Sequence, residues 1–306
     1  MRKFSAVLFA FIVVFGWSLI SLSASAIDPI VTDAPVDLTL EYKYSDTLFE
    51  GVDVDIYRVA NVYSNTVFGV DDKFGDYSIS LNNVKSQEEW NAIAQTFMSY
   101  IIADSIEPTA SAVTDADGKV TFNDLETGLY LISGVRIEYE KGYYAFDNFM
   151  MILPAAADDG TWSYEVNARP KSLYVKTEPD DVEYNILKLW KDTGYESKRP
   201  SAVEAELYKD GEYVETVTLN SENNWHYSWT APGDGAIWTV VETNIATGYT
   251  VTIEKRESTF IISNTYSENP PPPETGDSFN VEIYVIMAAI AGLGLIVVGI
   301  IGRRRA

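Results

Sequence analysis

The sequence contains no cysteine and a single histidine, His226. Without thiols it can form neither disulfides nor Cys/His zinc sites, and a Ser-His-Asp triad could be built only on His226. Cations are also scarce, since 22 Lys and Arg stand against 45 Asp and Glu, giving a net charge of −23. Such an acidic chain repels the phosphate backbone, so we expect no nucleic-acid partner, and we expect no metal and no cofactor.

Apolar and aromatic residues are abundant despite this acidity. Hydrophobic residues make up 46% of the 306 residues, and 20 Tyr and 7 Trp are present. A disordered acidic chain would lack these side chains, so the composition predicts folded cores. The length suits two ordinary domains.

The first 26 residues have the pattern of a secretory signal peptide. Arg2 and Lys3 precede an apolar run over residues 6–20, and small residues end the segment at Ala26. This order predicts export and cleavage between Ala26 and Ile27. An uncleaved membrane anchor is the alternative, which the shortness of the apolar run disfavours.

Near the other end, residues 283–301 are uncharged and mostly apolar, and residues 302–306 form a basic tail. A helix over 283–301 would be roughly 28 Å long, which matches the hydrocarbon core of a bilayer. The cations after it favour a cytoplasmic C-terminus, so the precursor is expected to cross the membrane once with its body outside the cell.

Residues 268–276 join the body to this apolar segment. Four prolines, Pro270–Pro273, favour a stiff polyproline II spacer, and Glu274, Thr275 and Gly276 follow. The order of Pro-x-Thr-Gly, apolar helix and Arg cluster resembles the cell-wall sorting signal of Gram-positive surface proteins. That resemblance implies that a sortase cuts between Thr275 and Gly276 and passes the Thr275 carbonyl to an amine of a cell-wall peptidoglycan precursor or of another subunit. Pro272 stands where the family usually has Leu, which leaves open which sortase acts; an ordinary membrane stalk is the alternative.

The body of the chain reads as short strands, many with alternating apolar and polar residues, separated by Asp-Gly and Pro-Gly pairs. We therefore expect an all-β fold of antiparallel sandwiches. One stretch departs from it. Ser86 and Glu89 form a capping box, and Trp90, Phe97 and Ile101 share one helical face, which predicts a helix over residues 86–104 as an insertion covering the first domain's core.

Strand patterning is interrupted between Pro170 and Asp181, where a domain boundary is expected. This gives a first domain over residues 27–172 and a second over 180–267. In the second, three polar residues alternate with large apolar ones: Lys188, Glu242 and Asn264. If those faces point inward, burial lowers the pKa of the lysine and raises that of the glutamate, giving a neutral amine and a protonated acid.

The second domain resembles a Cna B-type domain over nearly its whole length. The resemblance is carried by separated segments in sequence order, among them Ile186–Trp190, Glu206–Gly211, Asn224–Trp229, Trp238–Glu242 and Ile262–Tyr266. It implies an immunoglobulin-like sandwich, so we expect two such domains in tandem. It also implies an autocatalytic isopeptide bond between Lys188 and Asn264, with Glu242 as the assisting acid; the alternative is that these residues face solvent.

The end of the first domain resembles the pilin motif, whose lysine receives the sorting-signal threonine of another subunit. Trp162, Val166, Pro170 and Lys171 match, whereas Ala168 and Arg169 do not. The resemblance implies an intermolecular linkage between Lys171 and Thr275. An unspecialised surface lysine is the alternative. A further bond inside the first domain is left open, with Lys43 and Glu126 as conceivable participants.

These features predict a sortase-assembled pilus subunit on a Gram-positive surface, with no enzymatic activity beyond its own single-turnover bond formation. Its expected partners are a sortase, other pilin subunits and the cell-wall precursor. Whether it is a shaft or a basal subunit is left open. The alternative is a monomeric wall-anchored adhesin that binds a host surface ligand. A hydrolase with paired carboxylates is a weaker alternative, because nothing in the sequence singles out a pair.

Overall fold

The computed structural model describes residues 29–63, 67–81, 84–157, 160–177 and 180–268. The predicted signal peptide with Ala26 and Ile27, the sorting motif with Thr275 and Gly276, and the predicted helix over 283–301 lie outside these residues. Among the helices that are described, none combines the length and apolarity needed to cross a bilayer.

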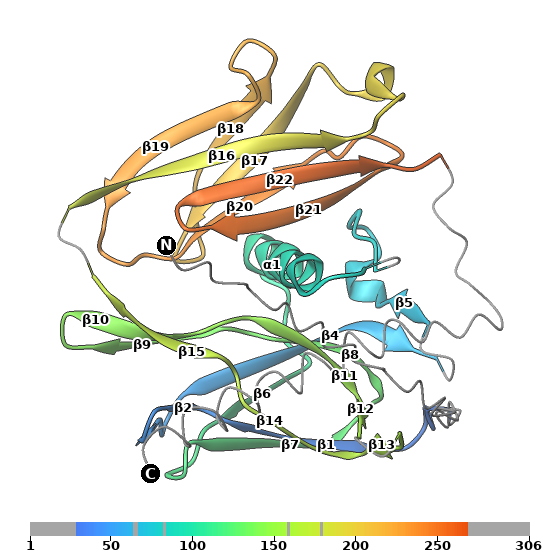
Figure 1. Cartoon of the computed structure of the whole chain (residues 1–306), viewed down its shortest axis with the longest axis vertical. Helices are drawn as coiled ribbons and strands as arrows, with labels where there is room; N and C mark the ends of the chain where they lie inside the picture. Colours follow the sequence, from blue (N-terminus) through green and yellow to red (C-terminus); the bar gives the residue numbers. More distant parts are fainter. Residues whose placement is uncertain (1–28, 64–66, 82–83, 158–159, 178–179, 269–306) are drawn as a thin grey trace, which may run out of the picture.

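The strands group into two units, one of residues 29–177 and one of residues 180–268, called here the N-terminal and C-terminal units (Figure 1). The strands of the N-terminal unit are β1 (Val36–Glu41), β2 (Lys43–Tyr44), β3 (Thr47–Leu48), β4 (Asp53–Val62), β5 (Phe68–Val70), β6 (Ala110–Val113), β7 (Lys119–Leu125), β8 (Gly128–Ile132), β9 (Val135–Tyr139), β10 (Gly142–Phe146), β11 (Phe149–Leu153), β12 (Ala155–Ala156), β13 (Trp162–Ser163), β14 (Glu165–Ala168) and β15 (Ser172–Lys176).

A sheet in the order β11-β8-β4-β5 forms the middle layer of this unit. Alternate residues of β4 and β8 belong to two different hydrophobic clusters, with Ile56 and Tyr130 on one side and Val59 and Leu129 on the other. The first side packs against the sheet β14-β1-β7, and the second faces the C-terminal unit. Burial on both faces explains why every residue of β8 is buried.

The second face of the middle sheet is covered by α1 (Gln87–Asp104). Ser86 Oγ accepts a hydrogen bond from the amide of Glu89 at 3.2 Å, while the Glu89 carboxylate accepts one from the amide of Lys85. The helix is thus capped largely as the sequence predicts. Ser105 ends it in the left-handed conformation.

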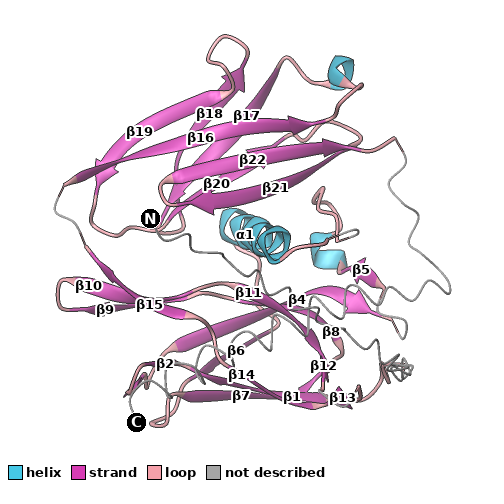
Figure 2. Ribbon diagram, viewed as in Figure 1, coloured by secondary structure: helices cyan, strands magenta, loops and turns pink. Residues whose placement is uncertain are grey.

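The C-terminal unit is a two-sheet sandwich (Figure 2). Its strands are β16 (Asp181–Lys191), β17 (Ala202–Lys209), β18 (Glu212–Asn220), β19 (His226–Pro232), β20 (Trp238–Thr243), β21 (Tyr249–Arg256) and β22 (Thr259–Tyr266). One sheet has the order β19-β16-β22-β21 and the other β18-β17-β20. The first and last strands, β16 and β22, are parallel neighbours.

Two details differ from the sequence predictions. Strand β15 pairs with β10, so the N-terminal unit continues to Lys176, beyond the expected end at residue 172. The helix does not cover only the core of its own unit: α1 lies between the two units and contacts β20 and β21 as well as β11 (Figure 1). Its buried residues and those of the C-terminal unit form one hydrophobic cluster.

Candidate functional site

Lys188, Glu242 and Asn264 meet inside the C-terminal sandwich. Lys188 lies on the inward face of β16, where Tyr184 and Ile186 are also buried, and Asn264 lies on the neighbouring strand β22. Glu242 comes from β20 in the facing sheet. Alternation thus places all three in the core, as the sequence predicts. We call them the buried triad.

One carboxylate contacts both of the other residues. Glu242 Oε2 lies 3.1 Å from Lys188 Nζ, and Glu242 Oε1 accepts a hydrogen bond from Asn264 Nδ2 at 2.7 Å. The side chains of Lys188 and Glu242 are 0% exposed. The glutamate therefore holds an amine and a carboxamide together in a site without access to solvent.

Several polar atoms of the triad lack hydrogen-bond partners among the described residues. They are Lys188 Nζ and Glu242 Oε2, which contact each other as an ion pair only, and Asn264 Oδ1. A buried polar group without a partner costs about 1–3 kcal/mol, and a buried ion pair is rarely better for stability than an apolar core. This arrangement is thus poor at stabilising the fold by noncovalent contacts.

The surroundings favour the neutral amine. Burial lowers the pKa of Lys188 from 10.5 to about 8, although the charges of Glu242 and Asp192 act in the opposite direction. A cation–π contact with the Trp190 ring, whose centroid lies 4.3 Å from Lys188 Nζ, likewise favours the charged amine, so burial is the effect that lowers the pKa. The Lys188 amine therefore gives up its proton more readily than a lysine in water does.

A second polar cluster borders the triad, and the sequence analysis missed it. The Asp192 carboxylate accepts two hydrogen bonds from the Arg199 guanidinium, at 2.8 and 2.6 Å, and one from the Tyr249 hydroxyl at 2.8 Å. The hydrogen bonds from Arg199 are the main cause of a lowered pKa of Asp192. Because Asp192 follows the end of β16, no alternating pattern marks it.

Lys171 is exposed and lies between β14 and β15, directly after the buried Pro170. Its positive charge acts on the carboxylate of Asp147, whose pKa burial raises and Lys171 lowers. The amide of Asp147 donates a hydrogen bond to the Lys171 carbonyl at 3.3 Å, which places Asp147 opposite Lys171 in the continuation of the β10-β15 ladder. The chain thus has one buried and one exposed candidate lysine.

Other sequence candidates are not brought together. The Glu126 carboxylate lies 2.9 Å from Arg58 in an exposed ion pair, and Lys43 lies on the short strand β2. His226 Nε2 contacts Asn185 Oδ1 at 3.0 Å on the surface of β19. In the described part of the chain, no three His, Asp or Glu residues are grouped so that they could hold a metal ion.

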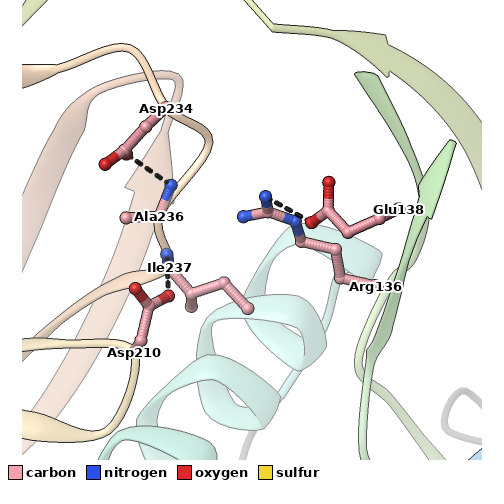
Figure 3. Close-up of a pocket in the computed structure, with 6 residues that line it drawn as sticks. All are labelled: Arg136, Glu138, Asp210, Asp234, Ala236 and Ile237. Atoms are coloured by element: carbon pink, nitrogen blue, oxygen red, sulfur yellow. Dashed lines mark hydrogen bonds and ion pairs between the residues drawn. The ribbon is translucent and has the colours of Figure 1, made fainter. Parts of the chain in front are cut away.

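A pocket of about 380 Å³ lies away from the triad, between the two units (Figure 3). Arg136 and Glu138 of β9 face the loops that carry Asp210, Asp234 and Ile237. The side chains of Asp210 and Asp234 accept hydrogen bonds from backbone amides of their own unit, and Arg136 pairs with Glu138. Arg136 also lies over the Tyr143 ring at 4.2 Å, while its buried Nε has no hydrogen-bond partner among the described residues. No hydroxyl or amine side chain lines the pocket, so it offers no nucleophile of that kind.

Comparison with known proteins places the triad in a recognised domain type. Residues 184–265 match the family of the Cna protein B-type domain. The chain is 28% identical over 167 residues to the collagen adhesin of Staphylococcus aureus, an alignment that takes in 50% of this chain and 14% of that protein. Among solved structures, a single B repeat unit of the collagen-binding protein Cna of Staphylococcus aureus is 18% identical, with a TM-score of 0.27, covering 76% of this chain and 100% of the repeat unit.

The shaft pilin spaA of Lactobacillus rhamnosus GG is 16% identical, with a TM-score of 0.27, and the match covers 78% of this chain and 100% of that pilin. The chain spans about one seventh of the length of the collagen adhesin. The C-terminal unit, with its immunoglobulin-like sandwich and its triad, is a Cna B-type domain.

Proposed function

We propose that this protein is a structural subunit of a sortase-assembled pilus, in which an autocatalytic bond between Lys188 and Asn264 locks the Cna B-type domain. The observation that carries the proposal is the single Glu242 carboxylate in contact with both the Lys188 amine and the Asn264 carboxamide. A buried ion pair with unpartnered atoms contributes little to stability, but it is suited to amide chemistry.

The reaction begins with a proton transfer from Lys188 Nζ to Glu242 over 3.1 Å. The neutral amine attacks Asn264 Cγ, and the Nζ–Cγ bond forms as the Cγ–Nδ2 bond breaks. The departing nitrogen takes one of the two remaining Nζ protons and leaves as ammonia, and the new amide keeps the other. This attack is assisted if the Asn264 carboxamide first rotates by half a turn, because Oδ1 then lies against the protonated Glu242, which polarises the carbonyl.

The ion pair and the reactive pair of neutral amine and protonated acid differ only in which residue carries the transferable proton. The fraction of molecules in the reactive form is therefore independent of pH as long as that one proton stays bound to the pair. Because Lys188 has a pKa of about 8, the pair loses that proton above about pH 8. The rate of bond formation should then be flat below this pH and fall about tenfold per unit above it, whereas an amine acting alone would react faster as the pH rises.

Lys171 and Thr275 supply the intermolecular part of the proposal. Lys171 is exposed and follows a buried proline between two strands, where its amine can be reached by a sortase that carries Thr275 as an acyl group bound through the Thr275 carbonyl. Signal cleavage after Ala26, sorting between Thr275 and Gly276, and the resulting wall or pilus location follow from the sequence motifs. Sortase, other subunits and the cell-wall precursor are the partners implied.

Intact-mass spectrometry of residues 27–275 tests the internal bond. The folded chain should be lighter than its sequence by one ammonia, and a peptide digest should contain a branched peptide joining Lys188 to Asn264. Glu242→Ala should restore the full mass. Glu204→Ala, which removes an exposed glutamate from β17, is the matched control and should retain the loss of ammonia. A parent chain of full mass would overturn the proposed bond.

Polymerisation is tested separately, in cells that express the whole chain with its sortase. The parent should give a ladder of detergent-resistant, high-mass species that disappears in Lys171→Arg. Lys176→Arg changes another exposed lysine close by on β15 and should leave the ladder intact. A ladder that persists in Lys171→Arg would remove Lys171 from the proposal.

A monomeric wall-anchored adhesin is the second candidate, because the curated relative is named a collagen adhesin. On this proposal the Cna B-type domain holds a binding surface for a host ligand away from the wall. A single wall-linked species in the parent, with no ladder, would favour the adhesin over the pilus subunit.

A further inference from the structure

The Cna B-type domain has an open side where its two sheets end. Strand β20 is the edge of one sheet and β21 is the edge of the other, so both leave backbone groups without a strand partner. The N-terminal unit supplies the missing cover, because α1 runs along these two strands (Figures 1 and 2). Edge strands that face solvent admit water, and a covering helix excludes it.

The cover is hydrogen-bonded to β20, which carries Glu242, and to β21, the neighbour of the strand that carries Asn264. The Tyr100 hydroxyl of α1 donates to the backbone carbonyl of Glu242 at 3.2 Å. On β21, the amide of Val251 donates to the Ser78 carbonyl and that of Ile253 donates to Thr96 Oγ1, both at 2.8 Å. Val251 is the cross-strand partner of Asn264. The N-terminal unit therefore forms hydrogen bonds with the backbone of Glu242 and with the residue that is paired with Asn264 on the neighbouring strand.

The helix is fixed in its own unit by its other face. The Trp90 ring contacts Phe68 and the Phe97 ring contacts Phe74, with centroids 6.2 and 5.1 Å apart. Thr96 and Ser99 are both 0% exposed, and their small side chains allow the helix to approach β21 closely. α1 is thus held from both sides, by aromatic contacts within its own unit and by its packing against β20 and β21.

Tyr100 also shares the electrostatic environment of the triad. Its ring is buried and lies 4.4 Å from the Tyr77 ring, measured between centroids. Burial raises the pKa of Tyr100 above its ordinary value, and the charge of Glu242 raises it further. The hydroxyl therefore stays protonated and remains a donor to the Glu242 carbonyl at any pH at which the protein is folded.

We propose that α1 belongs to the isopeptide site of the neighbouring domain: Tyr100 is a positioning residue for Glu242, and the helix excludes water from the triad. The bond then forms only after the N-terminal unit has folded and packed against the domain. No Cna B-type domain is therefore locked next to an unfolded N-terminal unit. This inference rests on the proposed internal bond.

The test follows bond formation during folding of the whole mature chain. Residues 27–275 are isolated unfolded from inclusion bodies, checked for full mass, diluted into buffers from pH 6 to pH 10, and quenched at intervals for intact-mass spectrometry. Tyr100→Phe removes the hydroxyl and keeps the ring, whereas Tyr100→Ala also opens the cover. Tyr77→Phe is the matched control, because its hydroxyl donates to Asp104 and not to Glu242.

Tyr100→Phe should slow the loss of ammonia about tenfold, the factor that corresponds to the roughly 1.4 kcal/mol of one hydrogen bond, with the fall in rate still above about pH 8. Tyr100→Ala should be slower still. Because water then reaches Lys188, the pH at which the rate falls should move from about 8 towards 10.5. A general loss of stability would not move that pH. Tyr77→Phe should react within about twofold of the parent.

Equal rates in the parent and in Tyr100→Phe would overturn the positioning role, even if Tyr100→Ala does not fold. An unmoved pH for a folded Tyr100→Ala would overturn the exclusion of water. A parent chain that never loses ammonia would instead overturn the proposed internal bond, so the two failures are distinguishable.

Discussion

The two β units bury polar groups of different kinds. Apart from tyrosines, the buried polar residues in the described strands and loops of the N-terminal unit outside α1 are Thr114 and Thr127, and both hydroxyls donate hydrogen bonds to backbone carbonyls. The buried Tyr42 hydroxyl has no hydrogen-bond partner among the described residues, but it carries no charge. The Cna B-type domain buries the charged residues Lys188, Asp192 and Glu242 together with Asn264. The first unit thus relies on apolar packing, whereas the second accepts a costly polar core.

This difference teaches where to look for chemistry in a structural protein. A buried charge pair is weak evidence for stability, so its presence points to another role, and an amine, a carboxamide and a carboxylate are the groups that the proposed amide exchange needs. An amide between Lys188 and Asn264 replaces the charged amine with a neutral group. Treated like a disulfide that closes the same loop, it would stabilise the domain by about 4–5 kcal/mol.

The largest effect is expected for Glu242→Ala. The bond is lost, at about 4–5 kcal/mol, and Lys188 is left buried without its partner, at about 3–5 kcal/mol, so the free energy of unfolding should fall by roughly 7–10 kcal/mol. Guanidinium unfolding followed by the fluorescence of Trp190, Trp229 and Trp238 reports on this domain. Glu204→Ala, the exposed control, should change it by less than about 0.5 kcal/mol. A small loss in Glu242→Ala would contradict the account of the polar core.

An apolar version of the triad would make the second unit resemble the first. In Lys188→Met/Glu242→Leu/Asn264→Leu the triad buries no charge, so only the bond is missing and the loss should be about 4–5 kcal/mol. The triple variant should therefore be more stable than Glu242→Ala although it carries more changes. The same fluorescence-detected unfolding experiment decides, and the reverse order would mean that the ion pair itself stabilises the domain.

Alternation together with the resemblance to a Cna B-type domain predicted the triad, and the structure buries all three residues. Lys188, Glu242 and Asn264 each share a strand face with large apolar neighbours, and a strand has a fixed period of two. The capping box likewise predicted α1, which begins directly after Ser86. Strand alternation and a capping box each depend on residues that are close together in the sequence, so both can be recognised before the fold is known.

The packing partner of α1 could not be predicted in the same way. The pattern of Trp90, Phe97 and Ile101 identifies an apolar face, but the face against the Cna B-type domain contains the polar residue Thr96. Its contact is a backbone amide of β21 that lies far away in the sequence. The hydrogen bonds from Arg199 to Asp192 were missed for a different reason, because both residues lie outside the strands, where alternation gives no signal.

A pH dependence should separate the bonded and unbonded forms of the triad. In Asn264→Leu the Lys188–Glu242 pair remains but no amide can form. The pKa of Lys188 is then about 8 in the folded chain and 10.5 in the unfolded chain, so between these values the unfolded chain binds more protons and stability rises with pH. The gain should approach about 3 kcal/mol.

The parent is the control for this measurement, because an amide at Lys188 does not titrate, while its other groups are the same. The difference in unfolding free energy between parent and Asn264→Leu should therefore shrink as the pH rises from 8 to 10.5. A difference that stays constant would show that Lys188 is not desolvated in the unbonded fold.

The smallest effect is expected at the cluster beside the triad. Tyr249→Phe removes one of the three side-chain hydrogen bonds to the Asp192 carboxylate, and the two from Arg199 remain. The free energy of unfolding should fall by about 0.5–1.5 kcal/mol. Bond formation should be as fast as in the parent, because Tyr249 contacts neither Glu242 nor the carboxamide. If intact-mass time courses showed a slower loss of ammonia in Tyr249→Phe, the reactive site would have to include Asp192, whose charge opposes the lowering of the Lys188 pKa.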